Sequence, residues 1–128
     1  FSQDAVIKLA PKAGIELDPA LSPAEKLKAV QALMEQDDPR AKDIFETIGS
    51  YLAYTVAQYC HFYELRYLML LGRVMSGKGG ECILSTCNAI LKEEFSVVAD
   101  RVKVMLPDEK TRRVGQSVAA ASLPQLRK

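Results

Sequence analysis

The residues best suited to chemistry lie in a glycine-rich loop that follows a short apolar segment. The apolar segment is Tyr67-Leu-Met-Leu-Leu71, and the loop reads Gly72-Arg-Val-Met-Ser-Gly77-Lys78-Gly-Gly80. Glycine lets a backbone approach a ligand closely, and the first N–H groups of a following helix offer free donors and a partial positive charge. Proteins bind phosphates and nucleotides at such places. The loop is therefore either an anion-binding site or a structural turn.

Segment 72–79 nearly matches the P-loop, in which glycines surround phosphates, a lysine reaches their oxygens and a hydroxyl binds magnesium. Lys78 stands at the lysine position, but the next residue is Gly79, where the motif requires Ser or Thr. The best later acidic candidate, Asp108, follows a proline after a weakly defined strand. A structural loop with a surface lysine is favoured over a P-loop.

The remaining titratable residues do not form a catalytic or metal-binding pattern. His61 beside Cys60 has no partner at metal-ligand spacing, and Cys82 and Cys87 would stand about 140° apart around a helix. We expect these thiols to be reduced and packed as small apolar side chains. No residue is a convincing general base.

Three helices are predicted before the loop. The first is short and ends near Pro11 and Gly14. The capping box Ser22-Pro-Ala-Glu25 starts a second helix, which extends to about Gln36. Asp38-Pro39 repeats the start signal, and apolar residues then recur every three or four positions to about Cys60. This pattern predicts one long helix.

The second half of the long helix carries a group of aromatic residues. Their spacing is mostly that of helix packing, and aromatic side chains gathered at one helix end also suit an interface. The group consists of Tyr51, Tyr54, Tyr59, Phe62 and Tyr63.

The pattern after the long helix predicts a β-α-β unit. The run Tyr67–Leu71 is too short for a helix and suits a strand covered on both faces. A helix over about 80–95 and a second strand near 101–106 follow, and a closing helix rich in small residues spans about 110–121. The fold class is therefore α/β, rich in helix.

Two strands rarely make a stable sheet alone, so the predicted sheet lacks partners. The missing strands come either from a larger parent chain, which we expect, or from another molecule. The chain is then a single incomplete domain over residues 1–128, with two short helices in 1–38 and the long helix followed by β-α-β-α in 39–128.

Composition limits the function classes. The chain has 128 residues, 48% of them hydrophobic, which suffices for one packed domain. Seventeen basic and sixteen acidic residues leave no charge excess for nucleic-acid binding by this segment. Charges interrupt the apolar runs, and the first residues lack the order of a signal peptide. We expect a cytoplasmic protein without a membrane partner.

The order of these motifs resembles the C-terminal part of ROK proteins (repressors, open reading frames and kinases). The resemblance rests on four segments of the chain, supported by the opening Phe1-Ser-Gln-Asp-Ala-Val-Ile. The segments are Ile48-Gly49-Ser-Tyr-Leu52-Ala, Leu71-Gly72-Arg-Val74, Gly77 with its helix, and Gly115-Gln-Ser-Val-Ala-Ala. It implies part of an actin-like (ribonuclease H-like) ATPase lobe and covers only the last part of a typical family member.

In the family, a Gly-Gly pair ends the corresponding strand, and its loop lies against the adenosine and phosphates of ATP. The positions that carry over as nucleotide-binding residues are Gly72, Arg73, Val74 and Gly77. The first glycine of the pair is Leu71 here, whose side chain would narrow the approach of a nucleotide. The family's N-terminal phosphate loop, catalytic aspartate, sugar-binding residues and zinc motif have no match and would lie upstream.

The resemblance implies a fragment of an ATP-dependent hexose kinase, or of a sugar-responsive regulator derived from one. Sugar, ATP and magnesium would bind the intact parent protein, and we expect no catalysis by this chain alone. One alternative is a non-enzymatic regulatory or assembly domain. Another is a small phosphate-binding α/β protein that dimerises to complete its sheet. The expected partner is therefore the rest of a parent chain or a second copy.

Overall fold

The computed structural model describes residues 3–106. The elements follow one another as α1 (Gln3–Lys12), α2 (Pro23–Glu35), α3 (Pro39–Phe62), β1 (Tyr67–Met69), a short 3-10 helix η1 (Arg73–Met75), α4 (Gly77–Glu94), α5 (Ser96–Arg101) and β2 (Lys103–Met105). The predicted helix over 110–121 lies outside the described residues. Within that range, no helix is both long and apolar enough to cross a lipid bilayer.

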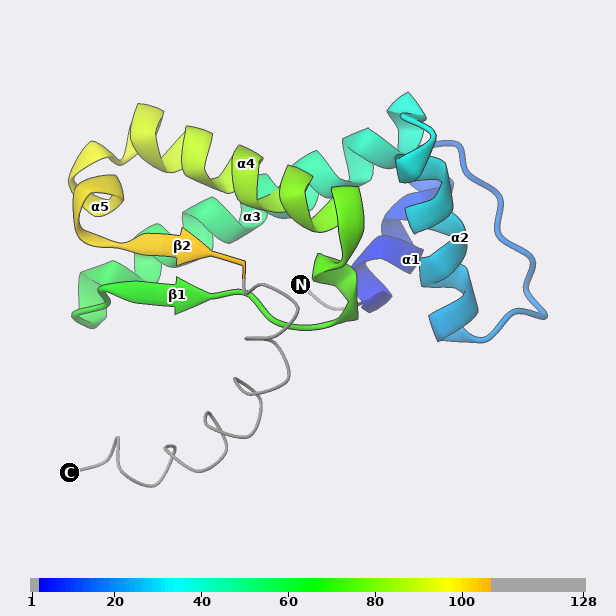
Figure 1. The fold of residues 1–128 in the computed structure, drawn as a ribbon, viewed down its shortest axis with the longest axis horizontal. Helices are drawn as coiled ribbons and strands as arrows, with labels where there is room; N and C mark the ends of the chain where they lie inside the picture. The colour runs from blue at the N-terminus through cyan, green and yellow to red at the C-terminus, as the bar shows by residue number, and fades with distance from the viewer. Residues whose placement is uncertain (1–2, 107–128) are drawn as a thin grey trace, which may run out of the picture.

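The chain is helix-rich, with one small parallel sheet (Figure 1). β1 pairs with β2 in parallel, and Leu68 lies opposite Val104 in the register. Because α4 and α5 connect the two strands, the predicted β-α-β unit is present. α3 and α4 run beside the strands, whereas α1 and α2 gather at the far end of α3 (Figure 1).

The contact between α3 and α4 forms the centre of the core. On α3, Phe45 is fully buried, and on α4 Ile83 and Cys87 are fully buried as well. A side chain at Gly49 of α3 would come within 2.8 Å of both the Ile83 carbonyl oxygen and Thr86 Cβ. Glycine at this position therefore lets the two helix backbones approach each other closely.

The strand prediction needs two corrections. β1 ends at Met69 rather than Leu71, and among the described residues it is covered on one face only. Leu68 packs against the core, whereas the side chains of Tyr67 and Met69 are 72% and 40% exposed. The helices pack on the Leu68 side, so alternate residues point away from them. β2 is likewise shorter than predicted, because α5 occupies residues 96–101.

The aromatic residues of α3 are exposed rather than packed in the core. Tyr51, Phe62 and Tyr63 each have more than 60% of their surface exposed. Tyr54 contacts α4, because its hydroxyl donates to the Glu94 carboxylate at 2.9 Å and its ring meets the Phe95 ring edge-on. The interpretation as helix packing is therefore wrong for most of the group.

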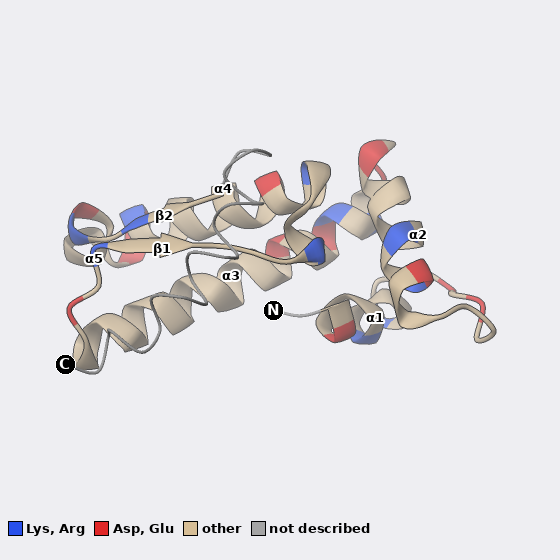
Figure 2. Cartoon of the chain, turned by 60° about the horizontal axis from the view of Figure 1, so that its bottom comes forward, with Lys and Arg blue, Asp and Glu red and all other residues tan. Residues whose placement is uncertain are grey.

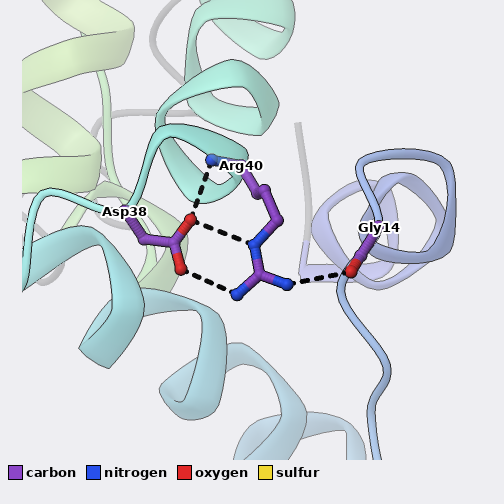
Figure 3. A network of polar contacts seen from close by, with 3 residues as sticks. All are labelled: Gly14, Asp38 and Arg40. Carbon is purple, nitrogen blue, oxygen red and sulfur yellow. Dashed lines mark hydrogen bonds and ion pairs between the residues drawn. The ribbon is translucent and has the colours of Figure 1, made fainter.

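Local capping fixes the starts of α2 and α3 as predicted. Ser22 and Glu25 form both hydrogen bonds of a capping box. Asp38 caps α3 by accepting from the Arg40 backbone N–H at 2.9 Å, and its carboxylate also accepts from Arg40 Nε and Nη2 (Figure 3). The second arm of the guanidinium donates to the Gly14 carbonyl at 3.0 Å. Arg40 thus ties the end of the α1 turn to the start of α3.

This network predicts a pH-dependent contribution to stability. Side-chain hydrogen bonds from Arg40, followed by its backbone N–H, lower the pKa of Asp38 from 3.8 to about 2. A lowered pKa in the folded state adds stability above the ordinary pKa, and this is lost as the pH falls from about 4 to about 2. Asp38→Asn keeps a capping side chain but does not titrate, so its unfolding free energy should fall less steeply over this range.

Urea denaturation at pH 2, 3 and 4 measures the difference between the two proteins. Asp43→Asn, on the exposed face of the same helix, is the control, because the Asp43 side chain makes no hydrogen bond or ion pair within residues 3–106. If the unfolding free energies of wild type and Asp38→Asn changed in parallel with pH, the pH dependence could not be assigned to Asp38.

Candidate functional site

The glycine loop leaves the sheet at the carboxyl end of β1 and leads through η1 into α4 (Figure 1). Gly72 has φ 118° and Gly77 has φ 65°, both in the region that favours glycine. α4 begins at Gly77, three residues before the predicted Gly80. Segment 77–80 therefore belongs to the first turn of the helix rather than to the loop.

Gly72 is the more open of the two glycines among the four predicted nucleotide-binding residues. A side chain built at Gly72 would meet no atom within 4 Å. The neighbouring Leu71 is 38% exposed, so the position that departs from the family's glycine pair lies at the surface too. A ligand therefore has room to reach the main chain at the end of β1.

Arg73 and Val74 are held by the protein in different ways. The carbonyl oxygen of Arg73 accepts from Gln31 Nε2 of α2 at 2.8 Å, and the residue itself is exposed. Val74 is only 4% exposed and belongs to the core. Arg73 thus remains able to contact a ligand, whereas Val74 positions the turn.

The start of α4 already holds a carboxylate from the same chain. Glu35 Oε1, at the end of α2, accepts from the Lys78 backbone N–H at 3.0 Å, and a side chain at Gly77 would come within 2.6 Å of that oxygen. The Lys78 ammonium pairs with Asp37 at 3.1 Å. Glu35 therefore occupies the place of an anion at this helix N-terminus, where negative charge is favoured.

The next two glycines serve packing rather than ligand approach. A Cβ at Gly79 would lie 2.7 Å from Phe45 Cε1, and a Cβ at Gly80 would overlap the carbonyl group of Met75. Both glycines are buried. Segment 77–80 therefore has a structural role at the start of α4 rather than a role in surrounding a phosphate. This agrees with the departure from the P-loop motif at Gly79.

The three cysteines are free thiols, as predicted. Burial raises the pKa of Cys87 to about 11, and it also raises the pKa of Cys60 and Cys82. The thiolate is the reactive form, so these groups are poor nucleophiles at neutral pH. Among residues 3–106, no group of three His, Cys, Asp or Glu side chains is placed to hold a metal ion.

The role of Glu35 could not be predicted from a sequence motif. It lies 43 positions before Lys78, so no local motif connects the two residues. The only available signal was the position of Gln31 and Glu35 one turn apart on a helix that is followed by a tight turn.

Three comparisons, with protein-family models, curated proteins and solved structures, gave no match to this chain.

Proposed function

We propose that the chain forms part of the nucleotide-side lobe of a ROK-type sugar kinase, or of a sugar-responsive regulator derived from one. The observation that supports this function best is the open main chain at Gly72, three residues after the end of β1 within a parallel β-α-β unit. In open α/β sheets, ligands bind outside the carboxyl ends of the strands. The ROK-like motif 71–74 lies in this unit, and the motif 48–53 lies on α3, which packs against α4 of the unit.

In this proposal, ATP contacts the main chain around Gly72 and the exposed Arg73 rather than the start of α4. Phosphates at the start of α4 would compete with the Glu35 carboxylate for the Lys78 amide, and the like charges would repel each other. Gly72, Arg73 and Val74 bring no oxygen-bearing side chain for magnesium. The metal ion would therefore be held by the phosphates and by other parts of the parent protein.

Phosphoryl transfer is expected to need residues that this chain does not supply. The reaction requires a positioned base, magnesium and contacts that stabilise the charge on the transferred group. This chain would contribute orientation of the nucleotide and would not phosphorylate a hexose alone. A coupled kinase assay with glucose and ATP is expected to give no activity above background.

Isothermal titration with ATP and magnesium tests the nucleotide proposal. The wild-type chain is expected to bind, and Gly72→Ala should weaken binding by at least about tenfold, since a side chain there is strained and points into the open approach. Gly14→Ala is the matched control: Gly14 also has a positive φ, 85°, with its nearest neighbour at an ordinary 3.8 Å. Absence of binding, or equal binding by the two variants, would contradict the proposal.

The exposed aromatic residues favour a second candidate function, an assembly or regulatory domain without a nucleotide. Tyr67 and Met69 leave one face of the sheet uncovered among residues 3–106, and Tyr51 and Phe62 are each 71% exposed on α3. Large exposed apolar groups are typical of interaction surfaces. Absence of ATP binding, combined with reversible dimerisation in sedimentation experiments, would favour this function.

A further inference from the structure

A cavity of about 890 Å³ opens at the amino ends of β1 and β2, at the opposite end of the sheet from Gly72. Four parts of the chain line it: the end of α3, the entry to β1, the middle of α4, and the link from α5 into β2. This volume lies in the range of small-molecule sites. The cavity is separate from the loop described above.

Three basic residues from two segments converge on this cavity. They are Arg66, Arg101 and Lys103. The Lys103 backbone N–H donates to the Arg66 carbonyl at 2.8 Å, so strand pairing holds these two residues side by side. Figure 2 shows positively charged positions gathered where α5 meets the starts of the two strands.

None of these three cations forms an ion pair within the part of the chain that the structure describes, although the charge of Arg101 acts on the neighbouring Cys60 thiol. Glu64 and Asp100 also line the cavity, yet neither forms an ion pair with Arg66, Arg101 or Lys103 in residues 3–106. The lining thus combines three positive and two negative side chains. Unpaired arginines remain free to bind an anion with both arms of the guanidinium group.

The rest of the lining suits the organic part of a ligand. Val102 and Val104 are buried and provide an apolar floor. The rings of Tyr63 and Tyr67 are 62% and 72% exposed, and the amide of Asn88 adds a polar group from α4. Aromatic rings at a cationic cavity can pack against a planar or sugar-like group while the cations hold its charge.

We propose that this cavity binds a small phosphate ester, with the phosphate held by Arg66, Arg101 and Lys103 and the organic group against Tyr63 and Tyr67. A phosphate ester offers three terminal oxygens to two arginine forks and a lysine, whereas a single carboxylate offers only two. The site lies at the amino edge of the sheet, so it does not depend on nucleotide binding at Gly72.

NMR titration of the uniformly ¹⁵N-labelled chain with phenyl phosphate tests this proposal, with sodium chloride at matched ionic strength as the reference. We expect saturable shifts of the Asn88, Val102 and Lys103 amides. Inorganic phosphate should shift the same amides but bind several-fold more weakly, because it lacks the ring that would contact the two tyrosines.

The double variant Arg101→Gln/Lys103→Gln should weaken phenyl phosphate binding by at least about tenfold. Arg66→Gln is a second, independent variant that removes the third cation of the cavity. The side chains of Arg66, Arg101 and Lys103 are exposed, so the fold should persist in both variants. Lys28→Gln on the exposed face of α2 removes one charge away from the cavity and should bind as wild type does. The proposal is overturned by absent saturation, by equal weakening in Lys28→Gln, or by shifts confined to residues 72–78.

Discussion

Gly80→Ala is expected to destabilise the protein by roughly 3 kcal/mol, which is at the upper end for an overpacked site. Alanine is the better helix former by about 1 kcal/mol, so propensity alone predicts the opposite result. The added methyl group would overlap the carbonyl carbon and oxygen of Met75. These are backbone atoms, which cannot turn away as a flexible side chain can, so η1 or the start of α4 must move.

Urea denaturation followed by helix circular dichroism measures this effect. Ser85→Ala, at an exposed position on the same helix, is the control and should stabilise α4 slightly through propensity alone. A Gly80→Ala protein as stable as Ser85→Ala would mean that the turn at Met75 does not lie against the start of α4. The loop would then be free to change shape around a ligand.

The sequence predicted the early helices well because their boundaries are encoded locally. Ser22 with Glu25, and Asp38 with the Arg40 backbone N–H, form their hydrogen bonds within three residues of the helix start. These caps depend on neighbours in the chain, which a sequence displays directly. The pairing of β1 with β2 joins Tyr67 to Lys103, and it could be predicted only from the order of strand, helix and strand.

The start of α4 was less predictable because its partner is distant in the sequence. A Gly-Lys-Gly-Gly segment has poor helix propensity and suggests a loop. In the structure, Glu35 caps it from 43 residues away, and the first turn therefore begins at Gly77. α5 was missed for a different reason: it has only six residues, and Phe95 alone separates it from the end of α4 at Glu94.

In the candidate site, too, the sequence predicted the local features and not those that depend on residues distant in the chain. The sequence located the loop at the carboxyl end of a strand and left open whether its glycines bind an anion or make a turn. The structure separates them: Gly72 is open, Gly77 faces Glu35, and Gly79 and Gly80 are packed against the protein. Such roles depend on which surfaces meet in space, and glycine spacing carries no information about that.

Gly79 and Phe45 should show strong energetic coupling, because the ring of Phe45 fills the space that a side chain at Gly79 would need. The closest ring atoms would lie 2.7 Å from an added Cβ, and Phe45 is fully buried. Gly79→Ala alone is therefore expected to cost roughly 2 kcal/mol through overpacking. Phe45→Leu alone should cost about 1 to 2 kcal/mol by leaving a cavity.

In the double variant, the alanine methyl occupies part of the volume vacated by the ring. The combined loss should therefore fall short of the sum of the single losses by at least about 1 kcal/mol, as measured by urea denaturation of all four proteins. Phe45→Leu with Ser85→Ala is the matched pair and should be additive, since Ser85 is exposed. Additivity at Gly79 as well would mean that the Phe45 ring does not fill the space beside Gly79, whereas coupling would show that the ring requires glycine there.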